Sequence, residues 1–493
     1  MFIYAYSLLQ GMSKNTLGIT VKKSEDFSEW YTQLIQKAEL ADYSAVSGCI
    51  IYRPNSYGIW EKIRDEIDQR FKAIGIKNAY FPLFIPEKLL QKEAAHIQGF
   101  SPEVAWVTHA GESKLDERIA VRPTSETIMY DSYSKWIRSH RDLPLRLNQW
   151  NNVVRWEFKH PTPFLRGREF LWNEGHTAFA TKKEAEAEKD QIIGIYKEVC
   201  DNYLALPSLI GKKSEKEKFA GAEYTVSMEF LMPHGKAVQG PDFHHDGQIF
   251  AKAFEITFLD EKGQKQYAWQ NTWAISTRML GVLFAVHSDD KGLVLPPRVA
   301  ELQVVIVPIL FDDSREKVLK EARKVKEKLE KQGIPAHLDD RSDYSPGWKF
   351  SEWEMKGIPV RIEIGPKDLE KKHATVVRRD TGEKQPLPLS GLHTKIGPLL
   401  ETIQRDLYTK AEDFLKRSII KVEDSKAGEK ALAADKLIFA PWCGTESCEE
   451  QWKEKTGAKS LNSPFEQPRM KKGQQCFACT KKASFWFYFG KSY

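Results

Sequence analysis

Two neighbouring stretches in which apolar and polar side chains alternate limit the fold of this chain more than any other feature. The first is NNVVRWEFK at 151–159, where Val154, Trp156 and Phe158 are expected to share one packed face. The second lies within FLRGREFLWNEGH at 164–176 and is expected to return beside the first. Its alternating positions on one face are Trp172, Glu174 and His176. A period of two is typical of strands with unlike faces, so the pattern predicts an antiparallel pair.

The surrounding sequence predicts an α+β domain with a mostly antiparallel sheet. A helix is expected over 56–75, because apolar residues recur at every fourth position and Gly75 can end it. The residues of that stripe are Ile59, Ile63, Ile67 and Phe71. Strands are expected in NAYFPLFIP, AWVTHAG, RIAVRP and FEITF, and YAWQNTWAISTRMLGVLFAV reads as a strand, a turn and a hydrophobic helix. We place this first domain at residues 1–295.

The pattern changes after the proline-marked segment GLVLPPRVA. Strands LQVVIVPIL, VRIEIG and HATVVRRD now alternate with two helices, one at 314–332 and one at KIGPLLETIQRDLY. Alternating strands and helices predict a compact α/β domain, which we place at residues 300–410. The remaining residues, 411–493, are expected to form a third and smaller α+β domain.

Four of the six cysteines lie in this last region, in the segments CGTESC and CFAC. They are Cys443, Cys448, Cys476 and Cys479. Two close cysteine pairs separated by a loop can arrange four thiolates in a tetrahedron, which predicts a structural zinc site without an open catalytic position. Four free or redox-active cysteines are the alternative. Cys49 and Cys200 stand alone and are expected to be buried as small hydrophobic residues.

The first alternating strand, whose open face is expected to carry Arg155 and Glu157, and the stretch that follows it combine charge with flat apolar surface. Arg155 can hold a phosphate or a carboxylate through two hydrogen bonds, and Glu157, two residues later, can accept from an amine. Arg166 can fold over this face, and Phe170 can stack on a flat ring. These properties suit ATP. The alternative is a solvated sheet face with an ordinary salt bridge.

Three further motifs offer weaker signals. In RPTSE, Thr124 and Glu126 could receive an ammonium group. In QGPDFHHDG, His244 and His245 are adjacent, but neighbours on a strand point to opposite faces, so a shared metal ion is not expected. Arg278 begins a helix, where a cation opposes the helix dipole unless it meets an anion or a ring. Because the chain has neither a GxxxxGK[ST] loop nor a GxGxxG turn, ATP would have to be held by arginines.

Composition and charge restrict the ligands and the cellular compartment that are expected for this chain. The chain has 493 residues and a net charge of +6, which is compatible with a nucleic-acid or phosphorylated ligand. No apolar run approaches the roughly 20 residues that cross a bilayer, so no membrane association is expected. The first residues lack a basic lead-in and a cleavage site, and Met1 and Met12 are both open as the start. A reducing cytoplasm fits the few cysteines.

Together these motifs resemble those of class II aminoacyl-tRNA synthetases, and they resemble prolyl-tRNA synthetases of the archaeal and eukaryotic type over nearly the whole chain. YFPLF is similar to motif 1 of the class, VVRWEF with FLRGREFLWNEGH to motif 2, and NTWAISTRMLG to motif 3. RPTSE, FLWNEGH and SPGWKF add specificity. Alternatives are a class II enzyme for threonine, serine or histidine, a non-catalytic paralogue that binds RNA, and a zinc-ribbon scaffold. Intact Arg155, Glu157 and Arg278 argue against the paralogue.

The resemblance implies ATP and L-proline as substrates, with Mg²⁺ whose ligands the sequence does not show. It implies that Arg155 contacts the α-phosphate and the amino-acid carboxylate, and that Glu157 reads the adenine amine. Phe170 and Arg278 would enclose the adenine, and Arg155 and Arg278 would be the catalytic residues. The other expected ATP-binding residues are Arg166, Gly167, Gln239 and Asp242. The expected proline pocket comprises Thr124, Glu126, Arg155, Trp172, Glu174, His176, His244 and Ser276.

The same resemblance assigns the other two domains. The segment EWEMKGIPVRIEIGPKD implies an anticodon-binding domain, in which four residues would read the two guanines of the tRNA(Pro) anticodon. These residues are Glu354, Arg361, Lys367 and Asp368. The C-terminal domain resembles the zinc-associated domain of the family, including the final YFGKSY. Motif 1 implies a homodimer, and the family implies a cytoplasmic protein.

The chain departs from the family pattern at two places, and one domain is missing. Pro241 and Asp242 stand where the family usually has glycine and threonine, and Ala274 stands where glycine is common in motif 3. An aspartate there would repel phosphate unless it faces the ribose or magnesium, and we predict that both changes are tolerated. Only about one hundred residues separate motifs 2 and 3, which leaves no room for the editing domain of bacterial-type enzymes.

Overall fold

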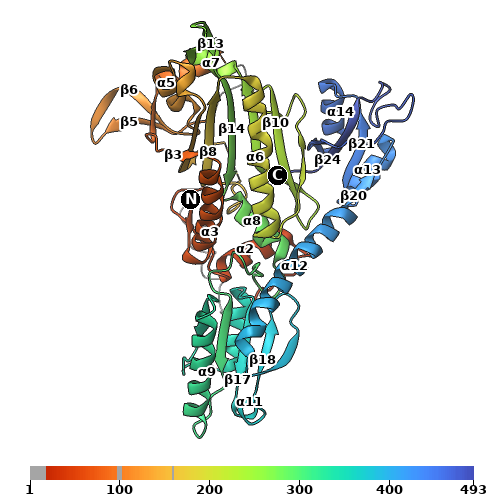
Figure 1. Cartoon of the computed structure of the whole chain (residues 1–493). Helices are drawn as coiled ribbons and strands as arrows, with labels where there is room; N and C mark the ends of the chain where they lie inside the picture. The colour runs from red at the N-terminus through yellow and green to blue at the C-terminus, as the bar shows by residue number, and fades with distance from the viewer. Residues whose placement is uncertain (1–17, 97–102, 158–159) are drawn as a thin grey trace. The chain divides into compact units, whose positions relative to one another are not determined.

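The structure is a computed structural model that describes residues 18–96, 103–157 and 160–493 (Figure 1). Its described residues divide into two compact units. One contains a large sheet and the C-terminal region and comprises Tyr43–Ile51, Trp60–Val286 and Tyr408–Tyr493. The other comprises the residues up to Asp42, Tyr52–Ile59 and His287–Leu407.

An eight-stranded sheet dominates the first unit, in the order β23-β9-β10-β11-β14-β8-β7-β3. All of its neighbouring strands run antiparallel except β3 and β7, which confirms the predicted mostly antiparallel sheet. The central strands are β7 (Leu145–Val154), β8 (Glu169–Phe179), β14 (Trp269–Ser276), β11 (Ala237–Gly247) and β10 (Tyr224–Leu231). The outer strands are β3 (Lys77–Asn78), β9 (Leu209–Lys212) and β23 (Ser463–Pro464).

The register of this sheet brings the two predicted motif strands together. Strand β8 pairs with β7 on one side and with β14 on the other, and Trp172 lies opposite Ser276 in β14. The predicted boundaries of the first alternating strand are wrong, because β7 begins at Leu145 and ends at Val154. At the end of β7 the buried valine is Val153 rather than the expected Val154.

Further corrections concern the residues that follow β7. Arg155 and Glu157 lie in the connection after the strand and not on its open face. Trp156 is 40% exposed and packs against the Arg168 guanidinium, 4.4 Å from its ring, instead of entering the core. Phe158, which was expected on the packed face, lies outside the described residues.

Helices cover both faces of the sheet. The expected helix over 56–75 is α3 (Pro54–Ala73), whose predicted stripe is buried and which is followed by Gly75 with a φ of 84°. Helix α6 (Lys182–Asn202) packs on one face, where Tyr196 donates to Asn173 of β8 at 3.0 Å. The other face is covered in part by two helices that share one apolar cluster. These helices are α5 (Glu126–Trp136) and α7 (Ile249–Phe254).

Smaller elements complete this unit. A three-stranded sheet has the order β4-β6-β5, and β12 pairs with β13. The bounds are β4 (Phe84–Pro86), α4 (Glu87–His96), β5 (Trp106–Ala110), β6 (Ser113–Val121), the 3-10 helix η1 (His140–Asp142), β12 (Thr257–Leu259) and β13 (Lys265–Tyr267). All of residues 180–268 are described, and they add strands and covering helices of the main sheet and the short pair β12 and β13 rather than an inserted editing domain.

The second unit contains the predicted α/β fold. Its five-stranded sheet has the order β16-β15-β17-β18-β19, with β15 parallel to both neighbours and the later pairs antiparallel. The strands are β15 (Val304–Pro308), β16 (Ala336–Leu338), β17 (Val360–Ile364), β18 (His373–Arg378) and β19 (Lys384–Pro388). The helices are α2 (Phe27–Lys37), α9 (Arg315–Glu330), α10 (Pro346–Met355) and α11 (Pro366–Glu370). Helix α9 buries the apolar side of the helix predicted at 314–332.

The C-terminal region has its own four-stranded sheet, in the order β20-β21-β24-β22. Its elements are β20 (Ile419–Lys421), α13 (Ser425–Ala433), β21 (Leu437–Trp442), α14 (Glu446–Thr456), β22 (Lys459–Ser460) and β24 (Phe485–Gly490). Helix α12 (Leu392–Ser418) runs through the predicted boundary at residue 410, so the three domain ranges stay a prediction. Helix α8 (Arg278–His287) completes the described helices, none of which combines the length and apolarity needed to span a membrane.

Candidate active site

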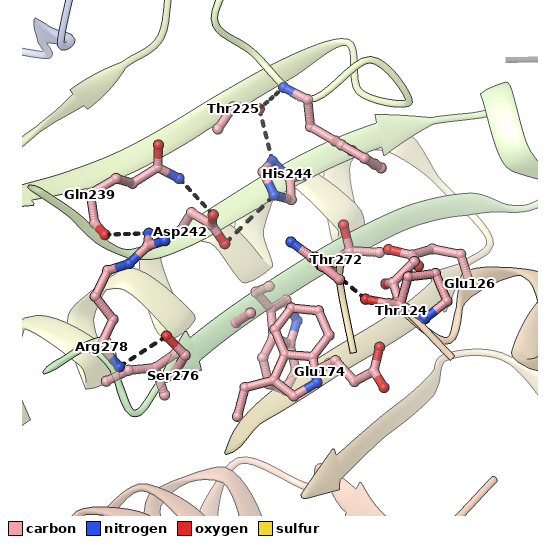
Figure 2. A pocket seen from close by; sticks show the side chains of 18 of the residues that line it. Thr124, Glu126, Glu174, Thr225, Gln239, Asp242, His244, Thr272, Ser276 and Arg278 are labelled. Carbon is pink, nitrogen blue, oxygen red and sulfur yellow. Dashed lines mark hydrogen bonds and ion pairs between the residues drawn. The ribbon is translucent and has the colours of Figure 1, made fainter. Parts of the chain in front are cut away.

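A cavity of about 500 Å³ opens on the face of the large sheet that lies opposite α6 (Figure 2). It is formed by β8, β11 and β14, by the turn before α5, and by the residues after β7. Most of the residues predicted to bind ATP or proline line it together. They are Thr124, Glu126, Arg155, Glu157, Phe170, Trp172, Glu174, His176, Gln239, Asp242, His244, Ser276 and Arg278.

One end of the cavity is cationic. Arg155 donates from Nε to the Pro123 carbonyl at 2.9 Å, and its guanidinium lies 5.5 Å from the ring centre of Phe170. Arg278, the first residue of α8, donates from Nε to the Leu165 carbonyl at 3.2 Å and from Nη1 to the Gln239 carbonyl at 3.1 Å. Burial, and next the charge of Arg155, lowers the pKa of Arg278. Two guanidinium groups that repel each other at a buried site favour a bound anion.

Asp242 lies between the cationic end and the middle of the cavity. Gln239 donates to its Oδ2 at 2.8 Å, and its Oδ1 lies 3.6 Å from Nε2 of His244 (Figure 2). Burial lowers the pKa of His244, while the charge of Asp242 opposes that effect. The register places Asp242 directly opposite Ala274 on β14, so the two departures from the family pattern are cross-strand neighbours.

The other end of the cavity is acidic. Glu126 lies in the first turn of α5, where the helix dipole favours a carboxylate, and it is 6% exposed. The hydroxyl of Thr124 donates to its Oε2 (Figure 2). A nearly buried carboxylate of this kind needs a cationic partner, and an ammonium group of a substrate would provide one.

Glu174 lies in the lining of the cavity and accepts several hydrogen bonds from its neighbours. Its carboxylate accepts from the Ser125 amide at 2.9 Å, from Gln149 at 3.1 Å and from Asn151 at 2.6 Å, and it lies 3.2 Å from His176. Burial opposes ionisation of Glu174, but the hydrogen bonds from His176, Ser125 and Asn151 outweigh it and lower its pKa to about 2. Glu174 is therefore an ionised group whose acceptor positions are used within the protein.

Two carboxylates and one imidazole at this end are close enough to hold a metal. Ligand atoms of Glu126, Glu174 and His176 all lie within 4.8 Å of one another. His176 also lies 3.2 Å from the Tyr130 hydroxyl through its Nδ1, so its ring is fixed on both sides. Because these contacts already occupy Glu174 and His176, we interpret the three residues as part of the polar lining of the cavity and not as a metal site.

Arg166 and Gly167 do not line the large cavity. Arg166 lines a neighbouring cavity of about 160 Å³, which shares Gln239 and Arg278 with the larger one. Gly167 lines neither of these two cavities among the described residues. A Cβ at Gly167 would approach the Gly48 carbonyl oxygen to 3.1 Å, so close backbone packing explains the glycine.

The sequence reasoning missed several residues that line the cavity. Thr225 on β10 lies 2.8 Å from Nδ1 of His244, and the Phe219 ring lies 4.9 Å from the His244 ring. Glu217, Lys218, Ala220 and Thr272 also line the cavity. Thr225, Ser227 and Glu229 alternate along β10 with the period of two that revealed β8, so the same signal could have found Thr225. Phe219 lies in a loop, where no periodic signal exists.

The predicted anticodon residues fall into two groups. Glu354, near the end of α10, lies 3.5 Å from Arg361 on β17, whose guanidinium is also 4.4 Å from the Phe350 ring centre. Lys367 and Asp368 lie instead in α11, after β17 has ended. Asp368 accepts from the Gly365 amide at 2.8 Å and thereby helps to cap α11.

The four C-terminal cysteines converge as the zinc prediction requires. Sγ of Cys448 lies 3.8 Å from Sγ of Cys476, and Sγ of Cys479 lies 3.7 Å from Sγ of Cys443. All four sulfur atoms lie within 4.8 Å of one another. A tetrahedral zinc ion with Zn–S bonds of about 2.3 Å separates its sulfur ligands by about 3.8 Å. The cluster therefore has the dimensions of a Cys₄ zinc site.

Comparison with known proteins identifies the family. The tRNA synthetase class II core domain (G, H, P, S and T) matches residues 107–287, the anticodon binding domain matches 303–398, and the C-terminal domain of prolyl-tRNA synthetase matches 427–493. The cytoplasmic proline–tRNA ligase of Arabidopsis thaliana is 51% identical over 484 residues, which cover 97% of this chain and 91% of that protein. The chain belongs to the prolyl-tRNA synthetase family. It is thus a class II aminoacyl-tRNA ligase for proline, as the motifs predicted.

Other members of the family are similar to this chain over nearly its whole length. The proline–tRNA ligase of Lachnoclostridium phytofermentans is 50% identical over 470 residues, covering 95% of this chain and 97% of that one. A crystal structure of prolyl-tRNA synthetase from Cryptosporidium parvum with halofuginone and AMPPNP has a TM-score of 0.94 and 49% identity, covering 97% of this chain and 100% of that chain. A second, with L-proline and AMP, has a TM-score of 0.93 and 48% identity, covering 97% and 98%.

Proposed function

We propose that the cavity on the large sheet activates L-proline with ATP and then transfers the prolyl group to the 3′ end of tRNA(Pro). The observation that carries this proposal is the polarity of a single cavity of about 500 Å³. Arg278 lies at one end and Thr124 and Glu126 lie at the other, and Arg155 and Phe170 line the same cavity (Figure 2). The related Cryptosporidium parvum enzyme, which has been crystallised with L-proline and AMP, supports the same two ligands here.

The cationic end would bind ATP. Arg155 would contact the α-phosphate and the proline carboxylate, and Arg278 and Phe170 would enclose the adenine ring. Glu157, which is exposed after β7, would accept from the adenine amine. The remaining residues assigned to ATP are Arg166, Gly167, Gln239 and Asp242.

The acidic end would bind proline. Glu126 would pair with the secondary ammonium and Thr124 would support it, because both groups are nearly buried and hydrogen-bonded to each other. The ring would lie against Trp172, His176 and the further lining residues His244 and Ser276. Glu174 would orient this wall from behind, since its oxygen atoms are already used by neighbouring residues.

The chemistry requires no protein nucleophile. A proline carboxylate oxygen attacks the α-phosphorus, a P–O bond forms, and the bond to the leaving pyrophosphate breaks. In the second step the 3′-terminal ribose hydroxyl of the tRNA attacks the prolyl carbonyl, and AMP leaves with the former carboxylate oxygen. Arg155 and Arg278 would lower the barrier by holding the reacting groups in line and by stabilising the charge at phosphorus. Mg²⁺ would accompany ATP and neutralise part of its triphosphate charge.

The second unit would bind the anticodon of tRNA(Pro). Arg361 and Lys367 could donate to guanine O6 and N7, and Glu354 and Asp368 could accept from guanine amines. The Phe350 ring beside Arg361 adds an apolar surface for a base. Since Asp368 already caps α11, its free acceptor capacity is smaller than that of Glu354.

Three further assignments accompany this proposal. Cys443, Cys448, Cys476 and Cys479 would hold a structural zinc ion. Two molecules would form a homodimer through the motif 1 region, where Tyr80 and Phe84 are 71% and 44% exposed although both are large and apolar. The domains would span 1–295, 300–410 and 411–493, and the protein would act in the cytoplasm like its Arabidopsis thaliana relative.

Amino-acid-dependent exchange of pyrophosphate into ATP tests the activity directly. The purified chain should support exchange with proline at a higher kcat/KM than with alanine, cysteine or threonine, each supplied separately with Mg²⁺. A folded protein that supports no exchange with any of the four would refute the proposal. Stronger exchange with threonine than with proline would refute the assignment of the pocket.

A further inference from the structure

A loop that lines the cavity is also held by the C-terminal region of the chain. The loop comprises residues 213–223 and connects β9 to β10. It follows β9 directly, and β9 pairs with β23, which the C-terminal region adds to the edge of the large sheet. The chemistry proposed above gives no role to the loop residues that line the cavity. They are Glu217, Lys218, Phe219 and Ala220.

One end of this loop contacts the expected proline pocket. The Phe219 ring centre lies 4.9 Å from that of His244. The Phe219 amide donates to Oγ1 of Thr225 at 3.0 Å, and that oxygen lies 2.8 Å from Nδ1 of His244 (Figure 2). The position of Phe219 therefore determines part of the surface that a bound proline would meet.

The other end of the loop contacts helix α14 of the C-terminal region. Ser214 donates from Oγ to Oε1 of Glu449 at 3.0 Å, and both side chains are buried. Ser460 donates to the same oxygen of Glu449. A second contact joins Lys216 to Glu450 at 2.6 Å, but it is exposed. A buried hydroxyl that loses its acceptor is costly, whereas an exposed ion pair contributes little, so Glu449 makes the more important contact.

A closed turn connects the two ends of the loop. The Lys218 amide donates to the Ser214 carbonyl at 3.0 Å, and the Glu217 amide donates to the Ser214 hydroxyl oxygen at 3.1 Å. The Ser214 side chain thus joins the turn to α14. Because Phe219 follows the turn directly, a displacement of Ser214 also displaces Phe219.

We propose that Glu449 is a positioning residue for the proline pocket, which acts through Ser214 and the turn to keep Phe219 beside His244. This inference rests on the proposed proline site. It gives the C-terminal region a part in proline binding although Glu449 itself does not line the cavity. Without this contact the loop is less ordered, so part of the binding free energy of proline is used to order it.

Substitution of Glu449 tests this role in pyrophosphate exchange. Glu449→Leu removes the acceptor and should raise the KM for proline about tenfold, with the KM for ATP within about twofold of the wild type. Glu449→Gln keeps an acceptor oxygen and should raise the KM for proline less. Lys455→Gln is a matched control with an unchanged KM for proline, because Lys455 also lies on α14 but pairs with Glu429 of the C-terminal region at 2.7 Å.

A double variant tests whether Glu449 acts through Ser214. Ser214→Ala alone should also raise the KM for proline. If the two residues act in one series of contacts, the double variant should have the KM of the more affected single variant, and not the product of the two increases. Independent, multiplying effects would overturn the proposed route.

The kinetic outcomes separate failure of this inference from failure of the function. An unchanged KM for proline in Glu449→Leu, with or without a lower kcat, would show a purely structural contact and overturn the positioning role. No exchange with proline in the wild type would overturn the proposed function instead.

A measurement on the wild-type protein keeps the inference testable if Glu449→Leu does not fold. Because coupling between two sites is reciprocal, proline added with AMPPNP should slow hydrogen exchange in α14 relative to AMPPNP alone. Helix α13 of the same region should exchange at an unchanged rate. Unchanged exchange in α14, or equal slowing in both helices, would overturn the positioning role.

Discussion

Glu174 supports a quantitative prediction, because its ionised form is stabilised only by the folded site. Its pKa is about 2 in the folded protein and 4.5 ordinarily. This lowering of the pKa corresponds to about 3 kcal/mol of stability at pH 7. The group is almost fully buried, so this value needs no reduction for exposure to solvent. In Glu174→Gln, the amide would place a donor against the donors of Gln149 and Asn151, and the stabilisation would be lost.

The free energy lost in Glu174→Gln should depend on pH, and the sign of that dependence can be tested. Because the folded pKa is depressed, the stabilisation is complete above the unfolded pKa and disappears as the pH falls through the folded pKa. The difference between wild type and Glu174→Gln should therefore shrink from about 3 kcal/mol at pH 7 to about 1 kcal/mol at pH 3.

Hydrogen exchange of peptides from β8 measures this difference locally, which avoids treating a protein of several domains as one unfolding unit. A matched control is Glu186→Gln on α6, an exposed position whose replacement should change the same free energy by less than about 0.5 kcal/mol. A difference that stays constant from pH 7 to pH 3, or one as small as that of the control, would show that Glu174 is not held as a stabilised carboxylate.

Three other predictions concern the zinc cluster, Asp242 and editing. Cys448→Ser should lower the zinc content measured by mass spectrometry from about one ion per chain and lower the thermal midpoint of the protein, whereas unchanged zinc would contradict the Cys₄ site. Asp242→Thr should alter the apparent KM for ATP and its dependence on Mg²⁺, and unchanged values would exclude a metal or ribose role for this residue. The purified chain should not hydrolyse alanyl-tRNA(Pro) faster than its spontaneous rate, since residues 180–268 contain parts of the main sheet, its covering helices and the short pair β12 and β13. Faster release of alanine would contradict this.

The sequence predicted those parts of the fold that depend on local periodicity. Two predictions depend only on the sequence of a single element, and the structure contains both. One is the alternation along β8, and the other is the buried stripe of Ile59, Ile63, Ile67 and Phe71. The face of β7 was misassigned because Val153 and Val154 are both apolar, and only the pairing with β8 decides which one is buried.

The site could be predicted where a residue is marked by its motif, but not where folding alone creates the contact. Arg155 and Arg278 are 123 positions apart in the numbering and line one cavity because the strands that precede them, β7 and β14, both pair with β8. Phe219 and Thr272 reach the cavity from a loop and from the middle of a strand without an unusual neighbour in sequence. The separation of Lys367 from Arg361 also depends on where β17 ends, which the sequence pattern does not specify.

The central claim is that one cavity binds proline at its acidic end and ATP at its cationic end. The most direct test is proline-dependent pyrophosphate exchange by Glu126→Gln, with the concentrations of proline and ATP varied independently. Because the substitution removes the charge that pairs with the secondary ammonium, the KM for proline should rise about tenfold to a hundredfold. The KM for ATP should stay within about twofold of the wild type. Equal increases in both constants, or an unchanged KM for proline, would contradict the account.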